Sequence, residues 1–270
     1  SDDVPSVVLI NSENGSVRTE GINVGGNAYV TGKGDVTTNG AVNASRSVVI
    51  GSFEGNVEVK GATGEDVTIK AVTGNVVADN VTANGADGTD PALRITAGRD
   101  IEAGSLEAAD GTVSVEAKNN ALIDGDVSAN TVAITAIEGE LVVKAPVTST
   151  VEGVTLAAGQ DAQLAGTVTA EKDATITAGR DIAATADITS NNGNIAAAAG
   201  RDASFAKLIA ENGEVTVTAK NSATLGAITT QNVNVLATDG DITLTEDLTA
   251  KGINLAANSG NVTTEALTAT

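Results

Sequence analysis

The sequence contains no cysteine, histidine, methionine or tryptophan among its 270 residues. Without cysteine there is no disulfide framework, and without cysteine and histidine the usual ligands of zinc, haem and iron–sulfur clusters are missing. Because synthesis begins with methionine, we expect a chain that lacks it throughout to be either a processed product or a piece of a longer protein, and removal of a secretory signal peptide is one simple explanation. We therefore expect a secreted protein that is extracellular or attached to a cell surface.

Aromatic side chains are almost as scarce, since Tyr29, Phe53 and Phe205 are the only three. An ordinary globular core needs bulky side chains to fill its irregular volume at high density. Here 41% of the residues are hydrophobic, and they are mostly Ala, Val, Ile and Leu. This composition favours a narrow and regular interior over a wide one.

Positive charge is also in short supply: 15 Lys and Arg stand against 35 Asp and Glu, which gives a net charge of −20. Binding to nucleic acid or to an anionic membrane requires a positive patch, so neither is an expected partner. The sequence has no run of about 18 apolar residues, and we expect no insertion into a membrane.

One pattern recurs from end to end: an apolar residue, a second apolar residue two positions later, and a turn rich in Gly, Asn and Asp. Most steps between the first apolar residues, here called anchors, are 18 to 22 residues long, and one is 26. The anchors are Val8, Ala28, Val48, Val67, Leu93, Val113, Val132, Val154, Ala174, Ile195, Val215, Val233 and Ile253. Internal repeats of this length are typical of solenoids.

Alternation with a period of two predicts short strands with one buried face, and three such strands occur in each repeat. The sequence therefore predicts an all-β, right-handed parallel β-helix of about thirteen three-sided coils of roughly 20 residues, forming a single domain over residues 1–270. We expect Ile95, Ile134 and Ile176 to be fully buried. Gly, Asn and Asp at the corners predict either a positive φ or an Asx turn.

The 26-residue step from Val67 to Leu93 predicts a loop inserted at a corner between residues 84 and 91. Asn84, Asp87 and Asp90 in this segment offer oxygen ligands of the kind that calcium binds. Their spacing matches neither an EF-hand nor the nonapeptide of calcium-binding β-rolls. We expect no resident cofactor, and these three residues are the candidate calcium ligands.

The motif Ala-Gly-Arg-Asp occurs at residues 97–100, 178–181 and 199–202, with a near copy at residues 158–161. The phrase Ile-Thr-Ala-Gly-Arg-Asp-Ile at residues 176–182 resembles the repeats of filamentous haemagglutinin-type secreted proteins. The resemblance implies a right-handed β-helical stalk and a role in a large bacterial surface or adhesion protein.

Asp161, Asp181 and Asp202 each follow an anchor by seven residues, so they should stack on adjacent coils. Gln160, Arg180 and Arg201 form the column beside them. This arrangement fits a ligand site, but a structural role is favoured, in which each Asp caps its own corner through local backbone N–H groups. The arginines would then neutralise the column diagonally.

Many right-handed β-helices cleave polysaccharides, so enzymatic activity has to be considered. Paired carboxylates can act as acid and base on a glycosidic bond. However, the chain offers few aromatic platforms for a sugar ring, no long loop to wall a cleft, and no His as general base. We therefore expect no enzymatic activity, and a polysaccharide-active enzyme is the less favoured alternative.

Apolar residues are expected at both ends of the solenoid, where a polar cap is usual. Val7 and Leu9 would face outward if Val8 and Ile10 face inward, and Leu255, Val262 and Leu267 would form the last coil. We predict that these residues, Val7, Leu9, Leu255, Val262 and Leu267, serve self-assembly, because heterologous contacts that do not close generate filaments. The favoured function is a non-enzymatic extracellular subunit of a head-to-tail homopolymer. The alternative is the stalk of a larger adhesin, with a glycan or protein receptor.

Overall fold

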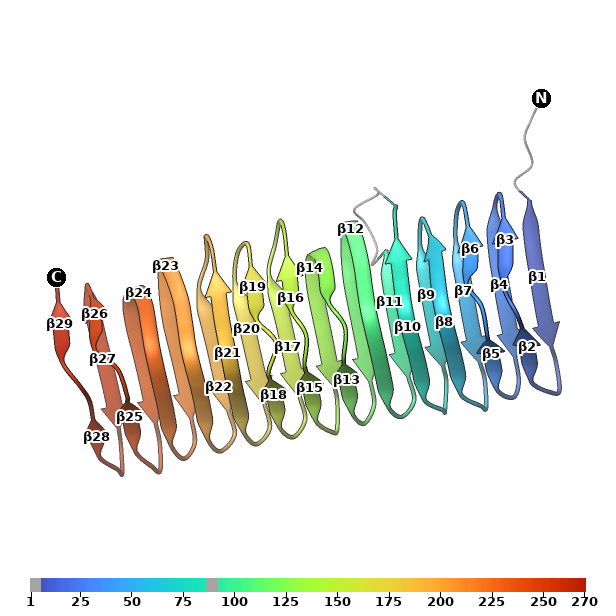
Figure 1. The fold of residues 1–270 in the computed structure, drawn as a ribbon. Coiled ribbons are helices and arrows are strands. Elements are labelled where there is room, and N and C mark those ends of the chain that lie inside the picture. The colour runs from blue at the N-terminus through green and yellow to red at the C-terminus, as the bar shows by residue number, and fades with distance from the viewer. Residues whose placement is uncertain (1–5, 86–91) are drawn as a thin grey trace. The chain divides into compact units, whose positions relative to one another are not determined.

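A computed structural model describes residues 6–85 and 92–270 of the chain (Figure 1). All regular secondary structure in these residues is β-strand, and none of it is helical. The strands pair in parallel and form a β-solenoid of about thirteen coils, which confirms the predicted fold class. The right-handed sense of the winding stays a prediction.

Residues Ser1–Ile137 and Glu138–Thr270 form two compact units by their internal contacts, and each is described by itself. The single domain over residues 1–270 stays a prediction. The strands of the first unit are β1 (Val7–Ser12), β2 (Val17–Thr19), β3 (Ile22–Val24), β4 (Asn27–Gly32), β5 (Val36–Thr38), β6 (Val42–Ala44), β7 (Val48–Ser52), β8 (Val57–Gly64), β9 (Val67–Ala71), β10 (Val76–Ala83), β11 (Leu93–Ala97), β12 (Ile101–Ala117), β13 (Ala121–Ile123) and β14 (Val127–Ala136).

The second unit has the same kind of coil, built from strands on three sides. Its strands are β15 (Leu141–Val143), β16 (Val147–Ser149), β17 (Val154–Ala158), β18 (Ala162–Leu164), β19 (Val168–Ala170), β20 (Ala174–Ala178), β21 (Ile182–Ser190), β22 (Ile195–Ala199), β23 (Ala203–Ala219), β24 (Ala223–Ala237), β25 (Ile242–Leu244), β26 (Leu248–Ala250), β27 (Gly252–Ala257), β28 (Val262–Thr263) and β29 (Leu267–Ala269). Some strands run through a corner, so β12 and β23 each cover more than one side of a coil.

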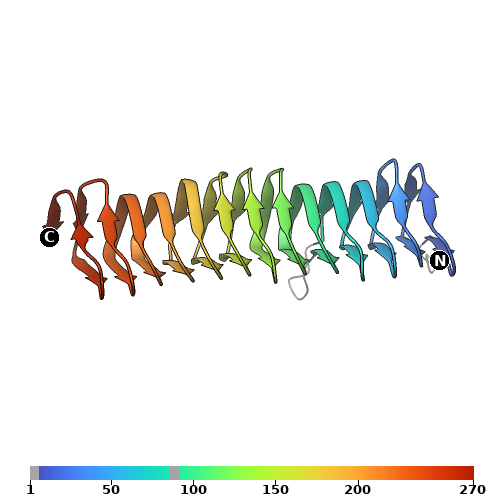
Figure 2. The same cartoon turned by 90° about the horizontal axis from the view of Figure 1, so that it is seen from below.

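Within each unit, every anchor lies directly beside the anchor of the next coil. In the first unit the register joins Val8 to Ala28 and continues coil by coil to Val132. In the second unit it joins Val154 to Ala174 and continues to Ile253. Successive coils therefore lie side by side in both units, as Figures 1 and 2 show. The predicted register is confirmed.

The interior consists of the inward residues of these strands. Ile95, Ile134 and Ile176 each have 0% exposure, as predicted. Most other core positions hold Val, Ala, Ile or Leu, because equivalent residues stack on one another and a narrow interior leaves little room for larger side chains. The outward residues between them are partly or fully exposed, which gives the period-two burial pattern of half-buried strands.

Glycines at the corners serve a different purpose from the predicted one. None of the described residues has a positive φ, so glycine is not selected for a left-handed backbone. Instead, a Cβ at Gly98, Gly179 or Gly200 would lie 2.1 Å from a carbonyl oxygen of the preceding coil. The glycine of the Ala-Gly-Arg-Asp motif therefore allows two backbones to pass at close range.

The 26-residue step is accommodated between β10 and β11. Val67 pairs directly with Leu93, so the extra residues do not disturb the register of the first strands. The backbone N–H groups of Asn84 and Gly85 still donate to the preceding coil, at 2.7 Å to Gly64 and 2.9 Å to Glu65. The rest of the predicted insertion, including Asp87 and Asp90, lies outside the described residues.

Candidate functional site

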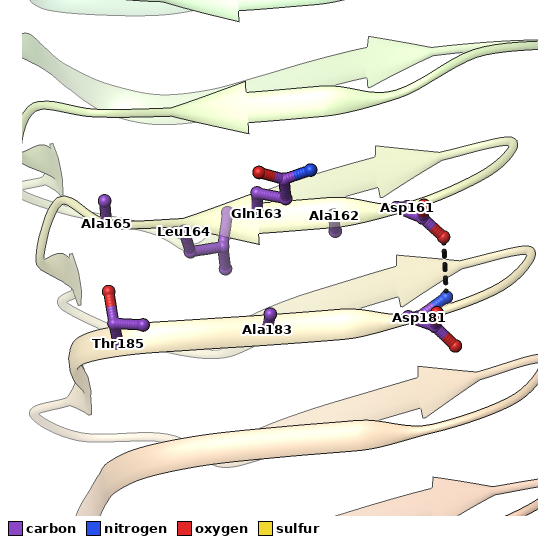
Figure 3. Close-up of a pocket in the computed structure, with 8 residues that line it drawn as sticks. All are labelled: Asp161, Ala162, Gln163, Leu164, Ala165, Asp181, Ala183 and Thr185. Atoms are coloured by element: carbon purple, nitrogen blue, oxygen red, sulfur yellow. Dashed lines mark hydrogen bonds between the residues drawn. The ribbon is translucent and has the colours of Figure 1, made fainter.

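A hollow of about 310 Å³ opens on the outer face of β18 and β21 in the second unit. Asp161 and Asp181 stand at one end of it, and the exposed side chains of Gln163 on β18 and Thr185 on β21 lie further along these strands (Figure 3). The hollow exists because small residues such as Ala183 occupy outward positions, where a longer side chain would fill the space. The complete lining comprises Asp161, Ala162, Gln163, Leu164, Ala165, Asp181, Ala183 and Thr185.

The two aspartates belong to a hydrogen-bonded column that follows one corner of the second unit. Asp161 Oδ1 accepts the backbone N–H of Asp181 at 3.1 Å, as the dashed line in Figure 3 shows. Asp181 Oδ1 accepts the N–H of Asp202 at 3.1 Å, and Asp202 Oδ1 accepts that of Ser222 at 2.9 Å. The predicted stacking of the three aspartates on adjacent coils is therefore confirmed.

The column, here called the corner ladder, differs from the predicted Asx turns. Each side chain accepts an N–H from the next coil, about 20 residues later, instead of an N–H from its own turn. Further along the second unit, Ser222 Oγ accepts the N–H of Asp241 at 3.2 Å, and Asp241 Oδ1 accepts that of Asn261 at 2.7 Å. The bonds satisfy backbone donors at corners, where the strand pairing is interrupted.

An equivalent corner ladder exists in the first unit, built from aspartate and asparagine in equal share. Asp35 accepts the N–H of Asn56 at 2.8 Å, and Asn56 accepts that of Asn75 at 2.9 Å. Asn75 in turn accepts the N–H of Asp100 at 3.2 Å, and Asp100 accepts that of Asn120 at 3.1 Å. The sequence analysis identified only Asp161, Asp181 and Asp202 as a column. The signal for the whole series is the polar residue that directly precedes the second strand of each coil.

Two arginines neutralise the ladder diagonally, as predicted. Arg180 Nε donates to Asp161 Oδ1 at 3.0 Å and its Nη2 donates to Oδ2 at 2.5 Å. Arg201 makes the same bidentate contact with Asp181, one coil later. Arg180 Nη2 also lies 3.5 Å from Glu140 Oε1, a partner one further coil back that the sequence did not suggest. Gln160 donates to the carbonyl of Glu138 at 3.0 Å.

These contacts lower the pKa of both aspartates. The hydrogen bond from Arg180 is the main reason why the pKa of Asp161 lies below its ordinary value, and Arg201 acts in the same way on the pKa of Asp181. Partial burial opposes the change at both positions, and the backbone N–H of the next coil supports it. A general acid needs a raised pKa, so neither carboxyl is suited to protonate a glycosidic oxygen.

We expect the ladder to make the stability depend on acidity. Because the folded-state pKa values of Asp161 and Asp181 are lowered, their stabilisation is present above the ordinary carboxyl pKa of about 4 and is lost as the pH falls through the folded-state values. A variant with both Asp161→Asn and Asp181→Asn keeps oxygen acceptors for the ladder but loses the charges. Its melting temperature should fall less steeply than that of the parent between pH 5 and pH 2, and parallel curves would contradict the assignment.

The candidate calcium residues are only partly within the described chain. Asn84 is exposed directly after β10, whereas Asp87 and Asp90 lie outside the described residues. Within residues 6–85 and 92–270, no three acidic side chains come close enough together to hold a metal ion.

The residues predicted to serve self-assembly fall on two kinds of surface. Val7 and Leu9 point outward from β1 and are 56% and 69% exposed. Leu255, Val262 and Leu267 belong to the inward rows of the last coil, where Leu255 is half-buried and the other two are each 45% exposed. The first pair therefore lies on a side of the solenoid, and the other three lie on a stacking surface.

No helix in the described part of the chain is long and apolar enough to cross a membrane. Comparison with protein-family models, with curated proteins and with solved structures gives no match to this chain. The fold and the corner ladder therefore define a parallel β-solenoid, and functional proposals depend on its surfaces.

Proposed function

We propose that this chain is a non-enzymatic, extracellular structural protein whose subunits stack head to tail into a fibre or matrix at the cell surface. The observation that carries the proposal is the open apolar row on the last coil. Val262 and Leu267 are each 45% exposed, whereas Ile242 and Leu248, their counterparts one coil earlier, are 0% and 1% exposed. One more coil stacked on this surface, either from a second copy or from further residues of the same chain, would bury the row, which is energetically favourable.

The first coil of a second copy fits this surface in its spacing. Val262 and Leu267 follow the anchor Ile253 by nine and fourteen residues, and in the first coil Val17 and Ile22 follow Val8 by the same nine and fourteen. Equivalent inward residues would therefore stack without an insertion. Parallel coils of one repeat pair through their backbone edges, as they do throughout each unit.

The corner ladder also continues across such a junction. Asn261 occupies the ladder position of the last coil, directly before β28, and Ser16 occupies it in the first coil, directly before β2. In a stack of two copies, the side-chain oxygen of Asn261 would accept the backbone N–H of Ser16 of the second copy, as each ladder residue accepts the N–H of its counterpart on the next coil. The junction would thus repeat both the apolar rows and the polar corner of the interior.

Location and the absence of catalysis are part of the proposal and rest on separate observations. The Ala-Gly-Arg-Asp phrases resemble those of secreted filamentous haemagglutinin-type proteins, which supports an extracellular place and a receptor of glycan or protein type. The lowered pKa values of Asp161 and Asp181 speak against acid–base chemistry in the hollow. A net charge of −20 favours solubility of the chain.

The test is the mass of the purified chain at rising concentration, measured by light scattering. The parent should form species much longer than a dimer, and Leu267→Lys should weaken this association at least tenfold, because a charge would enter an apolar row. Thr268→Lys is the matched control, since its side chain points outward from the same strand, and it should assemble like the parent.

Two outcomes would count against the fibre. A parent chain that stays monomeric at high concentration would favour the alternative, a stalk in a larger adhesin whose last coil is covered by further coils of its own chain. Equal assembly of Leu267→Lys and the parent would show that the open apolar row does not mediate the contact.

A further inference from the structure

An apolar hollow of about 270 Å³ lies on the outer face of the first unit, over β4, β7 and β9. Gly51, an outward residue near the end of β7, lines the hollow together with Val49, Phe53 and Val72, and Thr68 and Lys70 contribute polar groups to the lining. Phe53 stands beside the hollow with 63% of its surface exposed, and Val72 is 41% exposed. A large aromatic side chain and an empty apolar space therefore lie next to each other on one surface.

Neither the backbone conformation nor close packing requires glycine at position 51. None of the described residues has a positive φ, and a Cβ at Gly51 would meet only the carbonyl oxygen of Lys70 at 3.5 Å, an ordinary contact. By contrast, a Cβ at Gly55 or Gly74 would come within 2.4 or 2.2 Å of the preceding coil. Glycine weakens the interior of a strand, and where packing does not demand it, it often marks the close approach of a ligand or another chain.

The turn that contains Phe53 is fixed by hydrogen bonds within its own coil and to the preceding coil. Ser52 is buried, and its hydroxyl donates to the carbonyl of Gly34 at 2.8 Å and accepts the N–H of Gly55 at 2.8 Å. The N–H of Phe53 donates to the carbonyl of Gly32 at 3.0 Å. The backbone of Phe53 is thus fixed before any partner arrives, which lowers the entropic cost of binding.

The apolar surface extends from this hollow towards the first coil. Leu9, Tyr29 and Val49 lie beside one another in register on β1, β4 and β7, with Leu9 69% exposed. The surface formed by Val7, Leu9, Tyr29, Val49, Gly51, Phe53 and Val72 is here called the apolar face.

The scarcity of charge on the apolar face is the reason why we consider a second copy of this acidic chain as its partner. The outward residues of β1, β4, β7 and β9 include no carboxylate, and Lys70 is the only charged residue among them. Elsewhere 35 acidic residues give the chain its net charge of −20, so two copies that meet at random surfaces repel each other. Apart from Lys70, which lines the hollow, these strands bring no charged side chain against a second copy at the apolar face, and burial of its apolar side chains would favour the contact.

We propose that two copies of this chain pair side by side through the apolar face, with Phe53 of each copy inserted into the Gly51 hollow of the other. A two-fold contact requires a self-complementary surface, and a projecting ring beside a hollow is one. An apolar cavity of about 150 Å³ holds a benzene ring, so the hollow of about 270 Å³ has room for a phenyl group. The inference rests on the proposed function, in which it joins neighbouring fibres laterally.

The experiment uses the full chain carrying Leu267→Lys, so that stacking at the ends is blocked and only lateral pairing remains. Sedimentation velocity should show a dimer for this protein. Adding Phe53→Ala removes the ring, and adding Gly51→Leu fills the hollow; each should shift the protein to monomer, with association at least tenfold weaker. Val151→Ala is the control, because it shortens another exposed apolar side chain, 48% exposed, outside the apolar face.

Mixing the two variants gives the most specific result. A pair of one Phe53→Ala chain and one Gly51→Leu chain keeps one ring in one open hollow and has no clash at the other contact, so the mixture should form dimers again. No other occupant of the hollow, such as an apolar side chain of an unrelated protein, predicts this rescue. Phe53→Ser provides a second way to remove the ring if either variant is poorly folded by circular dichroism.

Two results would overturn lateral pairing: a Leu267→Lys chain that stays monomeric at every concentration, or folded variants that fail to dimerise when mixed. These outcomes are separate from failure of the proposed fibre. If the parent forms dimers but no longer species, and the Leu267→Lys chain forms the same dimers, stacking at the ends is refuted and lateral pairing stands.

Discussion

Replacing Ile134 with Asp should lower the melting temperature of the chain by about 10 °C or more. Ile134 has 0% exposure and lies in register with Val115 of the preceding coil, in a row of apolar residues. A carboxylate there loses its hydration and gains no partner, a cost that places the variant among the most destabilising single changes, at about 4 kcal/mol. In a chain of this size that corresponds to a shift of about 10 °C.

The matched control is Thr135→Asp, which places the same charge one residue later on the outward side of β14. Thermal melts followed by circular dichroism should show a change of a degree or two for the control. If Ile134→Asp melts within a few degrees of the parent, the inward register of this row is wrong.

Replacing Gly200 with Ala should also be strongly destabilising, although the change adds a single methyl group. The new Cβ would lie 2.1 Å from the carbonyl oxygen of Gly179 on the preceding coil, and backbone atoms cannot move aside without lengthening the bonds between coils. The N–H of Gly200 already donates to Ala178 at 3.0 Å, so this approach is part of the pairing. Overpacking of this kind costs about 1–3 kcal/mol.

Gly25→Ala is the control, because a Cβ at that position would meet nothing within 4 Å. Melting temperatures of the two variants, measured side by side, should differ by several degrees. Equal stabilities would contradict the conclusion that the close approach of two coils requires glycine at the corners.

The repeat was readable from the sequence because a solenoid places equivalent residues directly over one another. The anchors from Val8 to Val132 and from Val154 to Ile253 pair as the spacing predicts, since each coil must return to the same position beside the last. Diagonal pairing of Arg180 with Asp161 followed from the same stacking.

The corner chemistry was predicted less well, because it depends on distances between coils that a linear pattern does not contain. Asp181 accepts an N–H from Asp202 on the next coil, while the sequence suggested a local turn. The sequence predicts either a positive φ or an Asx turn at the corner glycines in general, whereas at Gly98 and Gly200 the structure shows that a carbonyl of the preceding coil leaves no room for a side chain. The hollow at Gly51 was missed altogether, since a glycine inside a strand carries no pattern of its own.

Negative-stain electron microscopy of the purified parent chain tests the proposed function most directly. We expect unbranched filaments many subunits long at high protein concentration, and their loss in Leu267→Lys but not in Thr268→Lys. Discrete particles of single-chain size in the parent, at concentrations where the protein remains folded, would contradict head-to-tail stacking of the last coil on the first.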